Sequence, residues 1–223
     1  MKNGYLMNNK IKYIIFSFII IEAILYLLFL SIDFLNFKIG DSSIYRYLTV
    51  IITFLFSVII LFINKKENEN IIDNILLSLA LLFTLLADFF LLVIYKYIEL
   101  GVSLFIIAHL FHFMRIIFIN KKILYSIFLR ILIPIIIIII LFIARFISLL
   151  NVLVSIYLAQ LIMNFIDNLT IYIKVKDYKY LLLSIGFFLF ICCDICVGLY
   201  NLKDIMGEFI WIFYTPSQVL LAL

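Results

Sequence analysis

Two aspartates lie in stretches where a carboxyl group is costly. Asp88 lies within LLSLALLFTLLADFFLLV and Asp194 within LLLSIGFFLFICCDICVGLY, and each apolar run is long enough to cross a bilayer. An ionisable side chain at mid-span costs at least about 2.5 to 3.5 kcal/mol, so such residues usually face the protein interior and serve a site or a pathway. Two neighbouring carboxyl groups at low dielectric constant cannot both ionise easily. One can then remain protonated as a general acid while the other activates water, which is the chemistry of paired-carboxylate hydrolysis.

The sequences around the two aspartates correspond to each other. When Asp88 is aligned with Asp194, Ser78 coincides with Ser184. The apolar segment after each aspartate carries a pair of residues four positions apart, Phe105 with His109 and Tyr214 with Gln218. We therefore expect two repeats, at about 1–120 and 121–223, with one acid in each.

The composition is that of a polytopic membrane protein. The 223 residues are 68% hydrophobic and 13% charged, with a mean hydropathy of +1.31, which leaves too little polar surface to face water. The net charge of +4 comes from basic residues dispersed between apolar runs, so nucleic acid is excluded as a partner. The abundance of Ile, Phe, Asn and Lys is typical of AT-rich coding sequence and favours a low-GC bacterium, with the chain in its cytoplasmic membrane.

Charged and polar breaks divide the chain into eight apolar segments, each near the roughly 20 residues that a helical span needs. They are 12–32, 43–63, 72–95, 98–119, 123–144, 148–173, 178–200 and 206–223. The sequence thus predicts an all-α bundle of eight transmembrane helices in a single domain, 1–223, built as two parallel four-helix repeats. Connections on the side of the termini carry twice as many Lys and Arg residues as those on the other side, which predicts that both termini are cytoplasmic.

Further polar residues share a layer with the two acids. At a rise of about 1.5 Å per residue, both aspartates lie roughly 9 to 11 Å below the outer surface, close to the depths of Tyr214 and His109. The sixth segment carries a polar face, and the second segment carries a polar stripe. The face is Tyr157, Gln160, Asn164 and Asp167, and the stripe is Thr49, Thr53 and Ser57. We expect these faces to turn inward and to line a cavity between the second, third, fourth, sixth, seventh and eighth segments.

Several residues also have structural interpretations. The aspartates could pair with a histidine or tyrosine only to fix helix packing. His109 and His112 have only carboxylates as neighbouring ligands, so we expect hydrogen bonding and no metal site. Arg115 is expected to reach the membrane interface or to meet a phosphate, and Glu22 has no evident role. The three cysteines near Asp194, which are Cys192, Cys193 and Cys196, are expected to be packing residues. No cofactor motif and no hydrolytic motif of soluble enzymes is present.

The order and spacing of four motifs resemble the lysoplasmalogenase (YhhN-like) family of eight-span membrane proteins. The motifs are LLFTLLADFFLL, GVSLFIIAHLFH, FLFICCD and FYTPSQVLLAL, and the resemblance covers about 70–223. The matching residues are Asp88, Gly101, Phe105, His109, Asp194, Tyr214 and Gln218, with Tyr157 and Met163 in the sixth segment. Ala87, Cys193 and Thr215-Pro216-Ser217 depart from the family pattern, which indicates a divergent branch.

The resemblance implies hydrolysis of the vinyl-ether bond of a lysoplasmalogen, giving a fatty aldehyde and a glycerophospho-alcohol. Asp88 and Asp194 would be the catalytic pair. The orienting residues would be His109, Tyr214, Gln218, Tyr157, Gln160 and Asn164, and the partner would be a lysophospholipid substrate. Two other functions fit the same sequence: a lipid or small-solute transporter or flippase, to which parallel repeats with intramembrane acids are suited, and a non-catalytic lipid-binding protein.

Overall fold

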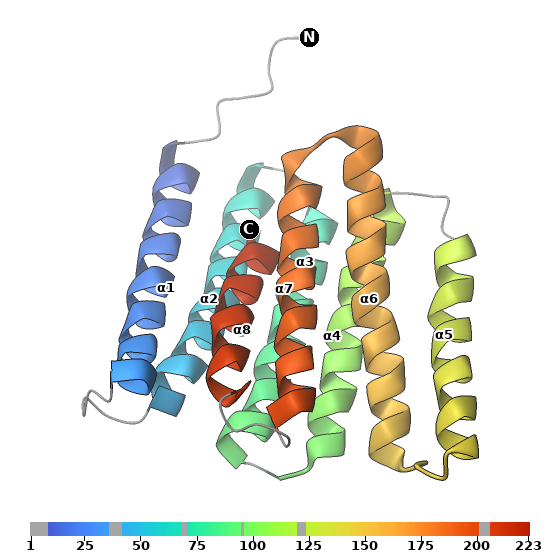
Figure 1. The fold of residues 1–223 in the computed structure, drawn as a ribbon. Coiled ribbons are helices and arrows are strands. Elements are labelled where there is room, and N and C mark those ends of the chain that lie inside the picture. The colour runs from blue at the N-terminus through green and yellow to red at the C-terminus, as the bar shows by residue number, and fades with distance from the viewer. Residues whose placement is uncertain (1–8, 36–41, 68–70, 95, 120–123, 201–205) are drawn as a thin grey trace.

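The chain forms a bundle of long helices (Figure 1). The structure, a computed structural model, describes residues 9–35, 42–67, 71–94, 96–119, 124–200 and 206–223. Over these residues there are eight α-helices, one π-helical segment and no strand. The helices are α1 (Asn9–Leu35), α2 (Ser42–Glu67), α3 (Ile71–Asp88), α4 (Ile98–Ile119), α5 (Leu124–Ile143), α6 (Leu149–Val175), α7 (Tyr178–Tyr200) and α8 (Met206–Ala222), and the π-helix η1 (Phe89–Ile94) continues α3.

Seven of these helices, α1 to α7, are long and apolar enough to cross a membrane. Helices satisfy their backbone hydrogen bonds internally, so such apolar runs can lie in lipid. The protein is therefore an all-helical, multi-pass membrane protein. Helix α8 has 17 residues and is shorter than the other seven, so the eighth span stays a prediction. The cytoplasmic side of the termini also stays a prediction, because loop residues that carry the charge bias, such as Lys121 and Lys122, lie outside the described residues.

The helix contacts follow a regular pattern. In each half, successive helices pack as neighbours: α1 with α2, α2 with α3 and α3 with α4, then α5 with α6, α6 with α7 and α7 with α8. The contact of α4 with α6 has its counterpart, four helices later along the chain, in the contact of α8 with α2. Helices α3 and α7 run in the same direction (Figure 1). Two parallel four-helix halves would produce this pattern, although the repeat boundaries remain a prediction.

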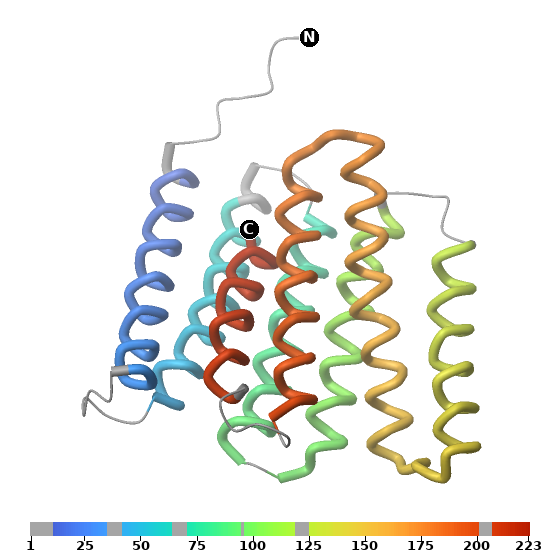
Figure 2. The backbone as a smooth tube through the Cα atoms, viewed as in Figure 1, coloured from blue at the N-terminus to red at the C-terminus, as the bar shows by residue number. Residues whose placement is uncertain are grey.

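Helix α5 is the peripheral element of the bundle. It packs against α6 and stands at one edge of the molecule (Figure 2). Large apolar side chains on its outer faces, such as Phe128, Ile131 and Ile139, are exposed and suited to contact lipid. Whatever holds α5 in place must therefore lie on its α6-facing side.

Helix α6 has defined caps at both ends. At its start, the hydroxyl of Ser148 accepts a hydrogen bond of 3.1 Å from the backbone N–H of Asn151. At its end, Lys176 adopts a left-handed conformation (φ 61°), and its N–H donates to the Tyr172 carbonyl. These caps fix the length of the helix that carries Tyr157 and Asn164, so they also fix the level of both side chains in the bundle.

The polar stripe of α2 faces inward, as expected. Thr49, Thr53 and Ser57 are each at most 2% exposed. Thr53 donates a hydrogen bond of 3.1 Å to Oε1 of Glu22 on α1, which gives that carboxyl group a partner that the sequence did not reveal. The pair fastens α1 to the rest of the bundle.

Candidate functional site

Asp88 lies where the α-helical turns of α3 give way to η1. Its side chain is 4% exposed, and Oδ2 accepts a hydrogen bond from the phenolic hydroxyl of Tyr214 on α8. A π-helical turn is rare and is found frequently at functional sites. Gly101 on α4 permits η1 to pack closely, because a Cβ atom there would lie 2.8 Å from Cγ of Leu91. The first acid is thus held by α8 and supported by α4.

Asp194 on α7 has a different tyrosine as its partner. The hydroxyl of Tyr157 on α6 donates to its Oδ2 at 2.6 Å, and Tyr157 is 7% exposed. The carboxyl group of Asp194 is less enclosed than that of Asp88. Each acid therefore accepts one phenolic hydrogen, but from helices that are not equivalent in the two halves. The repeat supplies two similar acids in different surroundings.

The Tyr214–Asp88 and Tyr157–Asp194 pairs lie in one cluster of side chains. The ring of Phe105 packs on those of Tyr157 and Phe190, with centroids 5.8 Å apart in each case, and Cys193, which is 3% exposed, directly precedes Asp194. The ring of Phe190 packs edge-on against Tyr214, with ring centroids 5.4 Å apart. Two acids, their two phenols and apolar side chains therefore share one part of the core.

His109 lies beside this group but is held by other partners. Asn164 Nδ2 donates to the His109 carbonyl oxygen at 3.1 Å and lies 3.4 Å from Nδ1 of the ring. The ring centroid is 5.3 Å from that of Tyr157. Its Nε2 atom is buried and has no hydrogen-bond partner among the described residues. His109 thus contacts a phenol of the site and keeps one ring nitrogen available.

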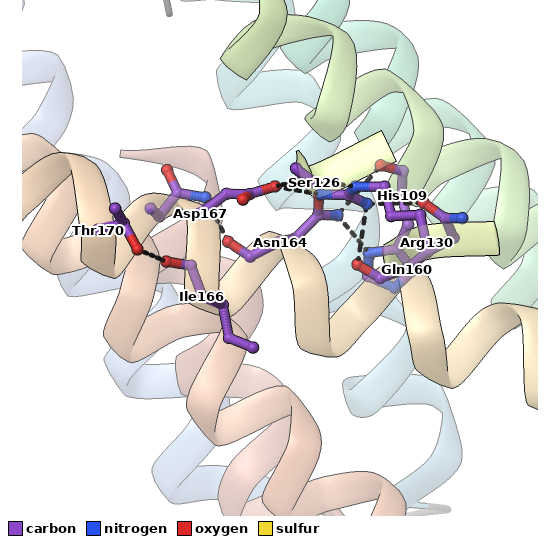
Figure 3. A network of polar contacts seen from close by, with 9 residues as sticks. His109, Ser126, Arg130, Gln160, Asn164, Ile166, Asp167 and Thr170 are labelled. Carbon is purple, nitrogen blue, oxygen red and sulfur yellow. Dashed lines mark hydrogen bonds and ion pairs between the residues drawn. The ribbon is translucent and has the colours of Figure 1, made fainter. Parts of the chain in front are cut away.

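Arg130 on α5 organises the polar face of α6 (Figure 3). It donates to Oε1 of Gln160 at 2.6 Å, to Oδ1 of Asn164 at 2.9 Å and to Oδ2 of Asp167 at 2.7 Å. Its guanidinium also lies over the ring of Phe113 on α4, 3.9 Å from the centroid. The arginine is 4% exposed, and its ion pair with Asp167 fastens α5 to α6.

This network changes the interpretation of the α6 face. Gln160 and Asn164, which were expected to orient the substrate, accept hydrogen bonds from Arg130 on α5. Within the described residues, Tyr157 is the member of that face that donates to Asp194. The sequence interpretation omitted Arg130, and it left α5 out of the helices that meet the polar layer. The signal was present, since an arginine in an apolar run requires a partner for the same reason as an aspartate does. Asn164 accepts from Arg130 and donates to the His109 carbonyl. The network therefore reaches the site only indirectly, through Asn164 and His109.

Gln218, another expected orienting residue, has a buried side chain on α8. It is 3% exposed, and its Nε2 atom has no hydrogen-bond partner among the described residues. It lies four residues after Tyr214, one turn further along the helix from the acid. The structure therefore places it near the phenol–acid pair without bonding it to Asp88.

Arg115 has a partner that the sequence did not reveal. It is 6% exposed and bonded to Asp73 on α3 at 2.7 and 3.3 Å, and its expected place near the membrane interface stays a prediction. Lys179 on α7 also donates to Asp73, at 2.7 Å. The end of α4 lies against the start of α3, which brings the opposite charges together, and a sequence cannot show such a contact. The cluster joins three helices at the end of the bundle remote from the acids.

The cysteines and histidines form no metal site within the described residues. No group of three His, Cys, Asp or Glu side chains there could hold an ion. The three cysteines are free thiols. His112 packs edge-on against Phe187, with ring centroids 5.2 Å apart.

A cavity opens at the end of the bundle nearest to Asp88 and Tyr214. This mouth cavity has a volume of about 440 Å³. It lies where α1 ends and α8 begins, and its lining includes Asp33, Arg46, Leu92, Glu208 and Trp211. The ring of Trp211 packs edge-on against Tyr214, with centroids 5.4 Å apart. A single aromatic contact therefore separates the mouth cavity from the phenol that is bonded to Asp88.

The model of the YhhN family matches residues 42–223. The chain belongs to the YhhN family. The YhhN match begins at the first residue of α2 and contains both acids, both tyrosines and Arg130. Glu22 and the rest of α1 precede it. No curated protein and no solved structure matches this YhhN protein.

Proposed function

We propose that the protein is a membrane-embedded hydrolase that cleaves the vinyl-ether bond of a lysoplasmalogen-like lipid, with Asp88 and Asp194 as the acid and base. The arrangement of the two acids carries this proposal. Each carboxyl group accepts a hydrogen bond from a tyrosine on another helix, and the packed rings of Phe105 and Phe190 link the two tyrosines. Membership of the YhhN family supports the same chemistry.

The reaction can be written with every proton assigned. A protonated carboxyl group gives its proton to the alkene carbon remote from the ether oxygen, and the lipid becomes an oxocarbenium ion. The other carboxylate takes a proton from water as its oxygen attacks the cationic carbon, giving a hemiacetal. The first carboxyl group, now ionised, then takes the hydroxyl proton of the hemiacetal, while the second gives the proton it took from water to the ether oxygen, which leaves. One water is consumed, and a fatty aldehyde and a glycerophospho-alcohol are released.

The surrounding side chains suit the remaining tasks. The phenols of Tyr157 and Tyr214 fix the direction of each carboxyl group by donating to its Oδ2. Preorganised groups of this kind do not need to reorient during the reaction. Phe105 and Phe190 pack on each other and on the phenols, an apolar setting that suits an alkenyl chain. His109, with its available Nε2, would position water.

The proposal is tested by replacing each acid separately. Asp88→Asn and Asp194→Asn should each lower aldehyde release from lysoplasmalogen by roughly 10²- to 10⁴-fold, the usual contribution of a general acid or base. Glu22→Gln is the matched control, because it removes a buried carboxyl group that is bonded to Thr53 instead of to a site residue. It should keep its turnover. Purified protein in detergent, a panel of lysolipids and mass spectrometry for the aldehyde supply the assay.

Deuterium oxide identifies the reaction type. Protonation at carbon should leave one deuterium on the carbon next to the aldehyde, which borohydride reduction traps as the alcohol. Aldehyde without that label would contradict acid-initiated cleavage. Movement of unaltered lipid across liposomes, without aldehyde, would favour a transporter instead.

A further inference from the structure

The mouth cavity has the size and lining of a ligand site. Its volume of about 440 Å³ lies within the roughly 300 to 1,000 Å³ usual for small-molecule pockets. One arginine, two carboxylates and a tryptophan contribute to its lining: Arg46, Asp33, Glu208 and Trp211. A cavity that served only to admit an alkyl chain would not need three charged groups.

Arg46 is held in a fixed position at this cavity. Nη2 donates to Oδ2 of Asp33 at 2.5 Å, and the guanidinium lies 4.9 Å from the ring centroid of Trp211. Its Nε atom is buried and has no hydrogen-bond partner among the described residues. The planar fork of an arginine matches the oxygens of a phosphate. A fork that is oriented by an ion pair and an aromatic ring, on a side chain that remains 20% exposed, is positioned to receive one.

The two carboxylates determine what kind of phosphate fits. Among the described residues of the lining, Arg46 is positive, and Asp33 and Glu208 are negative. A simple anion would meet net repulsion there, whereas a phosphodiester that also carries a cationic amine would meet opposite charges at both ends. The lining is therefore complementary to a zwitterion.

The cavity also lies at the correct place relative to the acids. Ring contacts of 4.9 Å and 5.4 Å connect the guanidinium of Arg46, through Trp211, to Tyr214. Leu92, which lines the cavity, follows Asp88 by four residues. A lipid with its head group in the cavity would direct its glycerol and ether oxygen toward the acids, and its chain into the apolar core.

We propose that the mouth cavity is the head-group subsite of the lipid substrate, in which Arg46 binds the phosphate and the carboxylates of Asp33 and Glu208 face a cationic amine. This inference rests on the proposed hydrolase function for the identity of the lipid. Arg46 is a specificity residue in this account, because it contacts the head group and not the bond that is cleaved.

Binding of lipids that cannot be cleaved tests the subsite independently of catalysis. The probes are alkyl-ether lysophosphatidylethanolamine, alkyl-ether lysophosphatidic acid and alkylglycerol, which carry both charges, phosphate alone and neither. The wild type should bind the ethanolamine lipid most tightly. Arg46→Gln should weaken that binding by about 10- to 100-fold, the range for charge-assisted hydrogen bonds, and should leave alkylglycerol binding unchanged. Arg145→Gln is the matched control, since Arg145 lies in the turn before α6 and does not line the cavity.

Glu208→Gln gives a second measurement that does not disturb the Asp33 ion pair. It should weaken binding of the ethanolamine lipid and strengthen binding of the lysophosphatidic acid. Equal loss for all three probes in Arg46→Gln, or no preference among them in the wild type, would overturn the proposal. Because no probe is hydrolysed, a protein without turnover can still show the preference. Turnover without any head-group preference would refute the subsite alone.

Discussion

Replacing Arg130 is expected to detach α5 from the bundle. The change Arg130→Met keeps most of the side-chain volume but removes the charge and the hydrogen bonds to Gln160, Asn164 and Asp167. Asp167, which has a side-chain exposure of 15%, would then lose its cation. No other helix has a comparable set of contacts with α5, because α6 is its main packing partner.

Two estimates bracket the cost of this change. Interhelical hydrogen bonds in membrane proteins average about 0.6 kcal/mol each, so three short bonds would contribute about 2 kcal/mol. Removing one partner of a buried ion pair costs about 3 to 5 kcal/mol, because an uncompensated charge remains. The second effect should dominate, because the hydrogen bond of 2.6 Å that Asp167 keeps from the hydroxyl of Ser126 does not neutralise its charge. We expect the free energy of unfolding to fall by about 3 to 5 kcal/mol.

A double-mutant cycle measures this directly. Thermal unfolding in detergent is followed for Arg130→Met, Asp167→Leu and the combined variant. The combined variant should be more stable than Arg130→Met alone, because no unpaired charge is left. Additive effects of the two single changes would refute the argument that the ion pair fastens α5.

Two further predictions concern the acids and the contact of η1 with α4. Tyr214→Phe and Tyr157→Phe each remove a hydrogen bond to a carboxyl group and should lower kcat by roughly 10- to 100-fold in the aldehyde assay, from about 1.5 to 3 kcal/mol per charged hydrogen bond; unchanged kcat in both would show that the phenols do not orient the acids. Gly101→Ala would introduce a Cβ atom 2.8 Å from Leu91 Cγ and should lower the free energy of unfolding by about 1 to 3 kcal/mol, whereas at Gly198 no atom lies within 4 Å of an added Cβ. Gly198→Ala is thus the control, and equal melting temperatures for the two alanine variants would contradict the close packing of η1.

The sequence predicted the helices and the acids because both follow from the cost of polar groups in lipid. Each of the eight apolar segments corresponds to one helix, and the eighth span stays a prediction. Asp88, Asp194 and Tyr214 were found because charge in an apolar run and the repeated spacing are visible without coordinates. The same rule applied to Arg130 would have found it.

Other features depend on contacts that no local pattern records. The π-helical turn after Asp88 depends on packing against α4, and FFLLVI alone does not distinguish it from an α-helix. The sequence did not reveal the partner of Arg115, because Asp73 is 42 residues away from it along the chain. The mouth cavity likewise combines residues from opposite ends of the chain, such as Asp33 and Trp211.

The position of Arg130 on α5 has a consequence for membrane insertion. During synthesis α5 emerges before α6, so the arginine enters the membrane before Asp167 exists to pair with it. An arginine costs about 2.5 to 3.5 kcal/mol on insertion, whereas each isoleucine contributes about −0.3 to −0.6 kcal/mol. The run of six isoleucines from Ile135 to Ile140 can therefore offset most of that cost. On these values α5 can enter the bilayer without a partner helix. When α6 follows, Asp167 pairs with the charge of Arg130 and joins α6 to α5.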